Sequence, residues 1–264
     1  MINSKHLMLF LVVFLLISCD NKEKIVEYYE NGNPKTVYIY EKGIKQDSSI
    51  HYYENIKEAI KAIKYWKNDS VYYQKDFFES GKIMRKGKLL RDNFRIGKWN
   101  LYSPENYKSE IIEYFNVNNE SYRNQTWKLN KRGDTILGGN FYRLLHFQDT
   151  LRYNQPSRTH FLLKQRLLEG ELFVCLPKKG MDVKPDFSNE NNITWDTINN
   201  IFREYKNESK YENAKYDVIF GLVSDKKGSN VLRGFLLEKE DVRHSDTLDF
   251  ITRKIYFEIP YCVE

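Results

Sequence analysis

Few residue patterns in this chain are typical of catalysis. The 264-residue sequence has no Gly-x-Ser-x-Gly segment to present a serine nucleophile, and no His-Glu-x-x-His or Cys-x-x-Cys pair to hold zinc. Gly138 and Gly139 are not followed by the Lys-Ser or Lys-Thr of a phosphate loop. We therefore predict no catalytic residue, no metal site and no cofactor.

The histidines offer only weak polar clusters. His146 and His160 flank a loop that contains Asp149 and Arg158, and His244 lies among charged residues of another polar segment. A hydrolase triad needs a nucleophile, a base and an orienting acid, and neither cluster supplies a recognisable set. Ordinary surface or core histidines account for both.

One residue near the start has a clearer chemistry. An apolar run from Leu7 to Ile17 follows Lys5; with 11 residues it is too short to span a bilayer but has the length of a signal-peptide core. It ends in Leu-Ile-Ser followed by Cys19, and the chain then turns polar. This segment resembles the lipobox of bacterial lipoproteins. The resemblance implies a signal peptide over residues 1–18, a lipidated Cys19 and a tether over 19–24; the alternatives are an ordinary cleaved signal with an accidental cysteine, or an uncleaved short anchor.

Several acyl chains on Cys19 would hold the protein at a membrane, because each buried CH₂ contributes about 0.8 kcal/mol. The resemblance therefore implies a location in the cell envelope. Asp20 next to the cysteine favours inner-membrane retention under the sorting rule of some bacteria, whereas acidic residues there accompany surface display in others. The composition, rich in Asn, Lys, Ile and Tyr, is typical of the AT-rich genomes of bacteria in which acidic residues accompany surface display. We therefore expect the outer membrane rather than the inner membrane.

The composition favours strands and gives no sign of a nucleic-acid partner. Aromatic residues make up 15% of the chain, with 20 Tyr and 16 Phe, and such residues suit strands. The net charge of +6 is mild, and its charges are spread along the chain. We expect a mainly β fold that does not bind nucleic acid.

The first half contains a repeat. The segment Glu-Tyr-Tyr-Glu-Asn-Gly at 27–32 returns as His-Tyr-Tyr-Glu-Asn at 51–55 and as Asp-Phe-Phe-Glu-Ser-Gly at 76–81. The spacing is 24 residues from Tyr29 to Tyr53, 25 to Phe78, and 24 more to Tyr102, with a looser copy at 127–133. Each copy reads as an aromatic strand, a turn with a glycine, and a second strand, so each unit is a β-hairpin that must stack on its neighbours.

This pattern resembles the bacterial variant of the MORN repeat, over residues 25–133. The resemblance implies a sheet of successive hairpins that binds lipid headgroups or partner proteins, and some members of the group carry an antitoxin label. One departure is Ile56, which stands where glycine is expected. Ile56, Ile60 and Ile63 would share one face of a helix over 55–66, but we favour the strand that the family pattern implies.

Two sets of side chains in the repeat region are candidates for binding. A basic run with Asp92 as its only acid would suit an anionic lipid surface, or would simply solvate a strand face; it comprises Lys82, Arg85, Lys86, Lys88, Arg91, Arg95 and Lys98. The recurring aromatic residues would form a ligand platform or, as we favour, the stacking core of the sheet; they are Tyr28, Tyr53, Phe78, Trp99 and Tyr102.

The second half, residues 134–264, reads as a β-sandwich-like domain with one helix. Strands are expected at 140–147, 161–168, 172–176, 216–223, 231–237 and 254–259, with a hairpin joining 216–223 to 231–237. A capping residue at Thr194 is followed by apolar residues at helical spacing, which are Trp195, Ile198, Ile201, Phe202 and Tyr205. We expect this helix to supply core residues.

Two further cysteines remain, Cys175 and Cys262, each in an apolar strand context. An exported protein permits a disulfide between them, and two buried free thiols are the alternative that we favour.

Together these patterns predict a membrane-anchored lipoprotein that acts as a binding or scaffold module, with an envelope protein as its partner. An immunity protein that neutralises a toxin is one alternative, and an envelope hydrolase is another.

Overall fold

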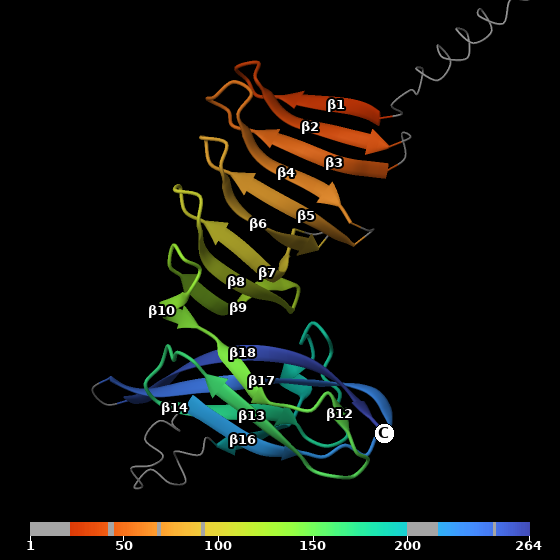
Figure 1. Cartoon of the computed structure of the whole chain (residues 1–264), viewed down its shortest axis with the longest axis vertical. Helices are drawn as coiled ribbons and strands as arrows, with labels where there is room; N and C mark the ends of the chain where they lie inside the picture. Colours follow the sequence, from red (N-terminus) through yellow and green to blue (C-terminus); the bar gives the residue numbers. More distant parts are fainter. Residues whose placement is uncertain (1–21, 42–44, 68–69, 91–92, 200–215, 245–246) are drawn as a thin grey trace, which may run out of the picture. The chain divides into compact units, whose positions relative to one another are not determined.

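The computed structural model is mainly β-structure over the residues that it describes, and the chain divides into two compact units, residues 1–82 and 83–264. It describes residues 22–41, 45–67, 70–90, 93–199, 216–244 and 247–264. The first ten strands form one antiparallel sheet in which they follow one another in chain order (Figure 1). The predicted mainly β fold with repeated hairpins is confirmed.

The first unit contains five strands of this sheet, each paired with the next in sequence. They are β1 (Lys22–Tyr28), β2 (Pro34–Glu41), β3 (Lys45–Tyr52), β4 (Ile60–Trp66) and β5 (Val71–Phe77). The strand expected over the second half of 55–66 is therefore confirmed as β4, and the helical alternative is wrong there. Pairing with two neighbouring strands overrides the helical spacing of the isoleucines.

The second unit begins with the other five strands of the sheet. They are β6 (Ile83–Leu90), β7 (Arg95–Tyr102), β8 (Lys108–Val117), β9 (Glu120–Leu129) and β10 (Thr135–Asn140). The β8–β9 hairpin turns through Asn118 and Asn119, which both have positive φ, as a two-residue turn between twisted strands requires.

The repeat is visible in the turns along one end of the strands. At this end four turns share one geometry, which the turn at Leu90 repeats at the other end: the first residue donates its N–H to the carbonyl four residues on, and the fourth residue donates back to the first. They begin at Tyr29, Phe78, Ser103 and Asn130, and their fourth residues have positive φ: Gly32, Gly81, Asn106 and Gly133. Glycine and asparagine tolerate that conformation, which explains the recurring turn residues.

The turn at Tyr53 differs, because its N–H reaches Ala59, six residues on. This turn is two residues longer than the other four, and the residue in it with a positive φ is Glu58. The turn geometry also sets the repeat register: Ser103, rather than Tyr102, corresponds to Phe78.

The rest of the second unit forms two sheets that share a hydrophobic core. One sheet has the order β11–β13–β16, with β11 (Tyr142–His146), β13 (Ser157–Leu163) and β16 (Asp217–Leu222). The other has the order β12–β18–β17–β14–β15, with β12 (Thr150–Leu151), β14 (Glu171–Pro177), β15 (Trp195–Asn199), β17 (Gly228–His244) and β18 (Thr247–Val263). A short 3₁₀ turn, η1 (Glu190–Asn192), precedes β15.

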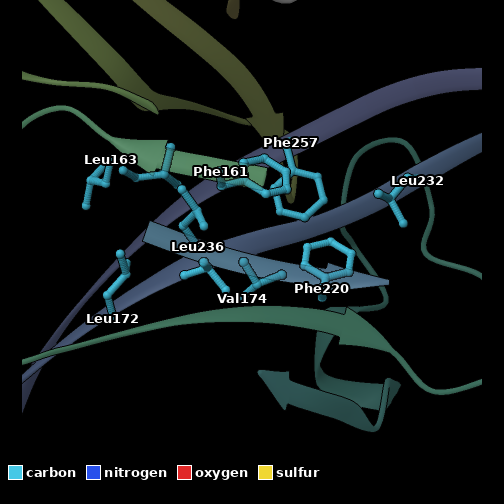
Figure 2. Close-up of a cluster of buried hydrophobic side chains, with 10 residues drawn as sticks. Phe161, Leu163, Leu172, Val174, Phe220, Leu232, Leu236 and Phe257 are labelled. Atoms are coloured by element: carbon cyan, nitrogen blue, oxygen red, sulfur yellow. The ribbon is translucent and has the colours of Figure 1, made fainter. Parts of the chain in front are cut away.

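The core between the two sheets is aromatic and aliphatic (Figure 2). Phe161 and Val218 come from the three-stranded sheet, and Val174, Leu236 and Phe257 from the five-stranded sheet; each is at most 1% exposed. The ring centroids of Phe161 and Phe257 lie 4.8 Å apart. Burial alternates along β13, as in a strand with one buried face, and two of its buried residues, Phe161 and Leu163, enter this core.

Two expectations for this half were wrong. Residues 195–199, the start of the expected helix, form strand β15 paired with β14; the rest of that helix lies outside the described residues. The expected hairpin is also absent, because β16 pairs with β13, whereas β17 pairs with β14 and β18. The loop residues between β16 and β17 carry the chain from one sheet to the other.

The opposite face of the five-stranded sheet is covered by the β8–β9 hairpin and by the segment before β15. Phe187 and Tyr256 pack there with Phe235. Asn124 of β9 is fully buried: its Oδ1 accepts the N–H of Tyr256 at 2.7 Å, and its Nδ2 donates to the carbonyl of Tyr256 at 2.9 Å. Its amide thus pairs with the edge of β18 as a neighbouring strand would.

Candidate functional site

The predicted lipidation site, Cys19, lies outside the described residues, so its lipid attachment remains a prediction. Within the part of the chain that the structure describes, no helix has the length and apolar character needed to cross a bilayer.

The basic run does not form one surface. Arg85 and Lys86 are neighbours on β6, so their side chains leave opposite faces of the sheet, and Arg95 and Lys98 are separated in the same way by the odd spacing on β7. The charges also lie over aromatic rings: Lys98 is 5.0 Å from the ring of Trp127. Lys82 precedes β6, Lys88 lies within it, and Arg91 lies outside the described residues. The run is therefore divided between two faces rather than gathered into a single anion-binding patch.

The recurring aromatic residues also have different environments. Trp99 is 1% exposed and lies against Gly87, whose missing side chain leaves room for the indole ring. Its Nε1 donates to the carbonyl of Lys88 at 3.0 Å. Tyr28, in contrast, is 62% exposed on the edge strand β1. The stacking-core interpretation fits Trp99, whereas Tyr53, Phe78 and Tyr102 are half-buried.

Cys175 and Cys262 are both free thiols, so the alternative of a disulfide between them is wrong. Cys175 pairs with Phe235, which pairs with Tyr256, and Cys262 lies six residues further along β18. Six residues of strand span about 20 Å, whereas a disulfide needs Cα atoms within about 7 Å. Cys175 is buried, which raises the pKa of its thiol to about 11, and Cys262 is exposed.

The sequence pattern placed Asp149 and Arg158 near His146 and His160, but the structure pairs His160 with a different acid. His160 Nε2 lies 2.6 Å from Oδ1 of Asp217, a residue of β16 that is distant in sequence. His146 pairs with His160 across β11 and β13. Among the described residues, no group of three or more His, Cys, Asp or Glu side chains could hold a metal ion.

A more organised constellation, which the sequence analysis missed, lies on one face of the first unit. We call it the polar strip; it comprises Thr36, Tyr38, Ser49, His51, Lys64, Gln74 and Asp76. Two cross-strand rows define it: Thr36, His51, Ala62 and Asp76 are in register, as are Tyr38, Ser49, Lys64 and Gln74. Residues two apart on a strand share a face, so the two rows lie side by side.

Hydrogen bonds fix the centre of the strip. His51 Nδ1 lies 3.3 Å from the Thr36 hydroxyl, and His51 Nε2 lies 3.1 Å from the Ser49 hydroxyl. Gln74 donates from Nε2 to Oδ1 of Asp76 at 2.6 Å. Thr36, Ser49 and Asp76 are at most 4% exposed, so these side chains form a polar floor beneath longer neighbours.

The electrostatics of the strip disfavour positive charge on its two bases. Burial lowers the pKa of His51, and the nearby charge of Lys64 lowers it further. Burial also lowers the pKa of Lys64, an effect that the charge of Asp76 partly opposes. His51 is therefore neutral at ordinary pH and can donate through only one ring nitrogen.

The contact between Ser49 and His51 resembles a nucleophile and its base, but its setting is unsuited to catalysis. Ser49 is only 3% exposed, and the second ring nitrogen of His51 contacts the hydroxyl of Thr36 rather than a carboxylate. A triad needs an accessible nucleophile and an orienting acid. The arrangement is suited to presenting hydrogen-bonding groups.

Among the described residues of the second unit, two of the surface hollows are notable for their size. The larger, about 730 Å³, is lined by the loop from Phe147 to Ser157, the loop that His146 and His160 were expected to flank. The smaller, about 560 Å³, includes Asp182, Asp225 and Tyr261. Asp225 contacts Lys179, and the side-chain hydrogen bond from that lysine holds the pKa of the Asp225 carboxyl below its usual value. Both hollows are polar and wide open.

A weak signal for the polar strip exists in the sequence. Polar residues recur two apart, as Ser49 with His51 and Gln74 with Asp76, at positions of a strand that share a face. Their gathering depends on the register between strands, which the sequence alone does not give. Comparison with known proteins adds no family: no family model matches the chain, and a search of the curated proteins finds no match.

Proposed function

We propose that this chain is a membrane-anchored binding or scaffold module of the bacterial cell envelope, held by lipid on Cys19. The observation that carries the proposal is the polar strip, because it fixes a set of hydrogen-bonding side chains on the face of an extended sheet. Stacked hairpins present such rows over several strands, and extended surfaces of this kind are used by repeat proteins for binding.

The opposite face of the same strands has a different character and supports a scaffold role. Val26, Val37, Ile50 and Ile63 are in register across four strands. Val37, Ile50 and Ile63 are half-buried, and Val26 is 36% exposed. The first unit thus offers a polar face and, opposite it, an aliphatic row that ends at Lys75 beside Tyr65, which suits contact with more than one envelope component.

The anchor is tested by replacing Cys19 with alanine and fractionating cells. We expect the wild-type chain in the membrane fraction and Cys19→Ala in the soluble fraction, since the acyl chains are lost. Cys262→Ala, which removes an exposed thiol, is the matched control and should remain with membranes. A Cys19→Ala chain that stays membrane-bound would refute the anchor.

The binding role is tested by purifying the lipidated chain from its own envelope and identifying what accompanies it. One protein recovered reproducibly supports a binding or scaffold role, and a toxin as that protein would replace it with the immunity alternative. Recovery of no component from either the wild-type chain or a crosslinked sample would count against the proposal.

A further inference from the structure

The first strand of the ten-stranded sheet is an open edge. Among the described residues, β1 is hydrogen-bonded to β2 alone, and all 7 of its residues are exposed. Its outer side therefore presents backbone N–H and carbonyl groups in the pattern with which another strand can pair. Where proteins bind a further strand at such an edge, the main-chain hydrogen bonds supply affinity and the side-chain pairs supply specificity.

Apolar side chains gather on this edge. Ile25, Val26 and Tyr28 are all exposed, although two of them are β-branched and one is aromatic. Val26 is also the outer end of the aliphatic row that continues through Val37 on β2. The row stops at the sheet edge, so a neighbouring strand with an aliphatic residue opposite Val26 would extend it and cover that side chain.

The sequence of β1, Lys-Glu-Lys-Ile-Val-Glu-Tyr at 22–28, restricts how a second copy of this strand can pair with it. Two copies related by a two-fold axis perpendicular to the sheet are antiparallel, and opposing side chains share a face, so the axis lies level with one residue. An axis at Lys24 or at Glu27 sets two like charges directly opposite each other. An axis at Ile25 sets Glu23 opposite Glu27 twice, and such like-charge pairs are destabilising.

An axis at Val26 avoids these repulsions and pairs residues 24–28 of the two strands. Val26 then faces Val26 of the second copy, which continues the aliphatic row across the axis. Ile25 faces Glu27, so no like charges meet there. Lys24 faces Tyr28, which places a lysine stem and its ammonium group beside an exposed aromatic ring. The strand therefore matches itself best in this one register.

We propose that β1 pairs antiparallel with β1 of a second copy of this chain, with the two-fold axis at Val26, so that the two first units form one continuous sheet. The self-matching sequence of the strand favours a second copy over an unrelated strand. A pairing this short buries a small interface, so the dimer should be weak and should depend on protein concentration. The inference goes beyond the proposed function and does not depend on the lipid anchor.

The first test is analytical ultracentrifugation of the full-length, detergent-solubilised chain, which should show a monomer–dimer equilibrium. Val26→Lys sets two ammonium groups opposite each other at the axis and should raise the Kd of the dimer roughly tenfold. Ile25→Lys is the matched control, because it adds the same charge to the same exposed strand but opposite Glu27, so the Kd should stay unchanged or fall. Thermal unfolding shows whether each variant keeps the fold.

Cysteine crosslinking tests the register in a Cys262→Ala background, which lacks the exposed thiol. Val26→Cys should give a disulfide-linked dimer on oxidation, because its two Cα atoms would lie about 5 Å apart. Glu27→Cys faces Ile25 instead and should crosslink much less. The proposal is overturned if the wild type stays monomeric at the crosslinking concentration, if Val26→Lys leaves the dimer intact, or if the two cysteine variants crosslink equally. A different envelope protein that pairs with β1 of a monomeric chain would also overturn it.

Discussion

The first five strands and the C-terminal pair of sheets are both antiparallel β-structure, but they are held together differently. In the first unit the fully covered side chains include Thr36, Ser49 and Asp76, which are polar. In the C-terminal sheets the core is Phe161, Phe257 and their aliphatic neighbours. Among the described residues, both hydrophobic clusters belong to residues 83–264. Strand pairing and turns account for most of the stability of the first region, and apolar burial accounts for most of the stability of the second.

The largest expected effect is in the aromatic core. Phe257→Ala should destabilise the second unit by about 3–5 kcal/mol, because it leaves a cavity beside Phe161. Denaturant unfolding measures the change. Phe250→Ala, on the exposed part of the same strand, should cost less than about 0.5 kcal/mol. Equal costs for the two variants would contradict the burial-based account of this region.

The next effect concerns the side chain that pairs with the edge of β18. Asn124→Ala should cost about 2–4 kcal/mol, because the buried N–H and carbonyl of Tyr256 lose their partner together. Asn31→Ala removes exposed hydrogen bonds in the repeat region and should cost much less. Similar midpoints for the two variants in chemical unfolding would show that β9 does not depend on this contact.

A third variant tests packing within the ten-stranded sheet. A Cβ at Gly87 would lie 2.4 Å from the ring of Trp99, so Gly87→Ala should cost about 1–3 kcal/mol through overpacking. Gly32→Ala meets no neighbour within 4 Å and should cost about 1 kcal/mol, through its positive φ alone. Near-ultraviolet circular dichroism of the Trp99 environment should change only for Gly87→Ala.

The smallest expected effects are in pH dependence, and the two regions should respond with opposite signs. The folded-state pKa of His51 is lowered by burial and Lys64, so the first unit should lose stability as the pH falls below the ordinary histidine value. The negative charges of Glu27 and Asp76 raise the pKa of His51 and the positive charge of Lys61 lowers it, so these residues also affect its folded-state pKa. His51→Gln should remove this part of the pH dependence, as followed by hydrogen exchange in β3 and β4.

Glu238 of β17 should make stability change with pH in the opposite direction. It is fully buried, and burial raises its pKa despite hydrogen bonds from the N–H groups of Leu167 and Leu168. Stability linked to its protonation is present below the ordinary glutamate value and is lost as the pH rises through the folded value. Glu238→Gln should flatten this slope in hydrogen exchange of β14 and β17. A slope of the same sign in both regions would contradict the assignment.

The two regions also differed in how far sequence could describe them. The hairpins were predictable because a turn residue such as Gly32 or Gly81 marks each one locally. The C-terminal pairing was not, because β13 pairs with β16, more than fifty residues away, and no short pattern encodes that choice. The helix expected from Trp195 and Ile198 was wrong because their spacing of three suits a helix, whereas pairing with β14 makes these residues a strand, β15.

The polar strip was missed for a related reason. Ser49 and His51 are visible as neighbours on one strand, but their relation to Lys64 and Asp76 exists only once the register of four strands is known. The lipidation expected at Cys19, which stays a prediction, rests in contrast on local residues alone, since the apolar run and Cys19 are contiguous.

The chain-order sheet has a consequence for how such a protein can change in length. Each strand of the first ten pairs only with its neighbours in sequence, and the turns at Tyr29, Phe78 and Ser103 repeat one geometry. A gene segment encoding one hairpin could therefore be duplicated or deleted at these turns without changing the partners of the remaining strands. The number of hairpins, and with it the area of the sheet, is open to adjustment by recombination, while the C-terminal sheets, closed by distant pairings, are fixed in size.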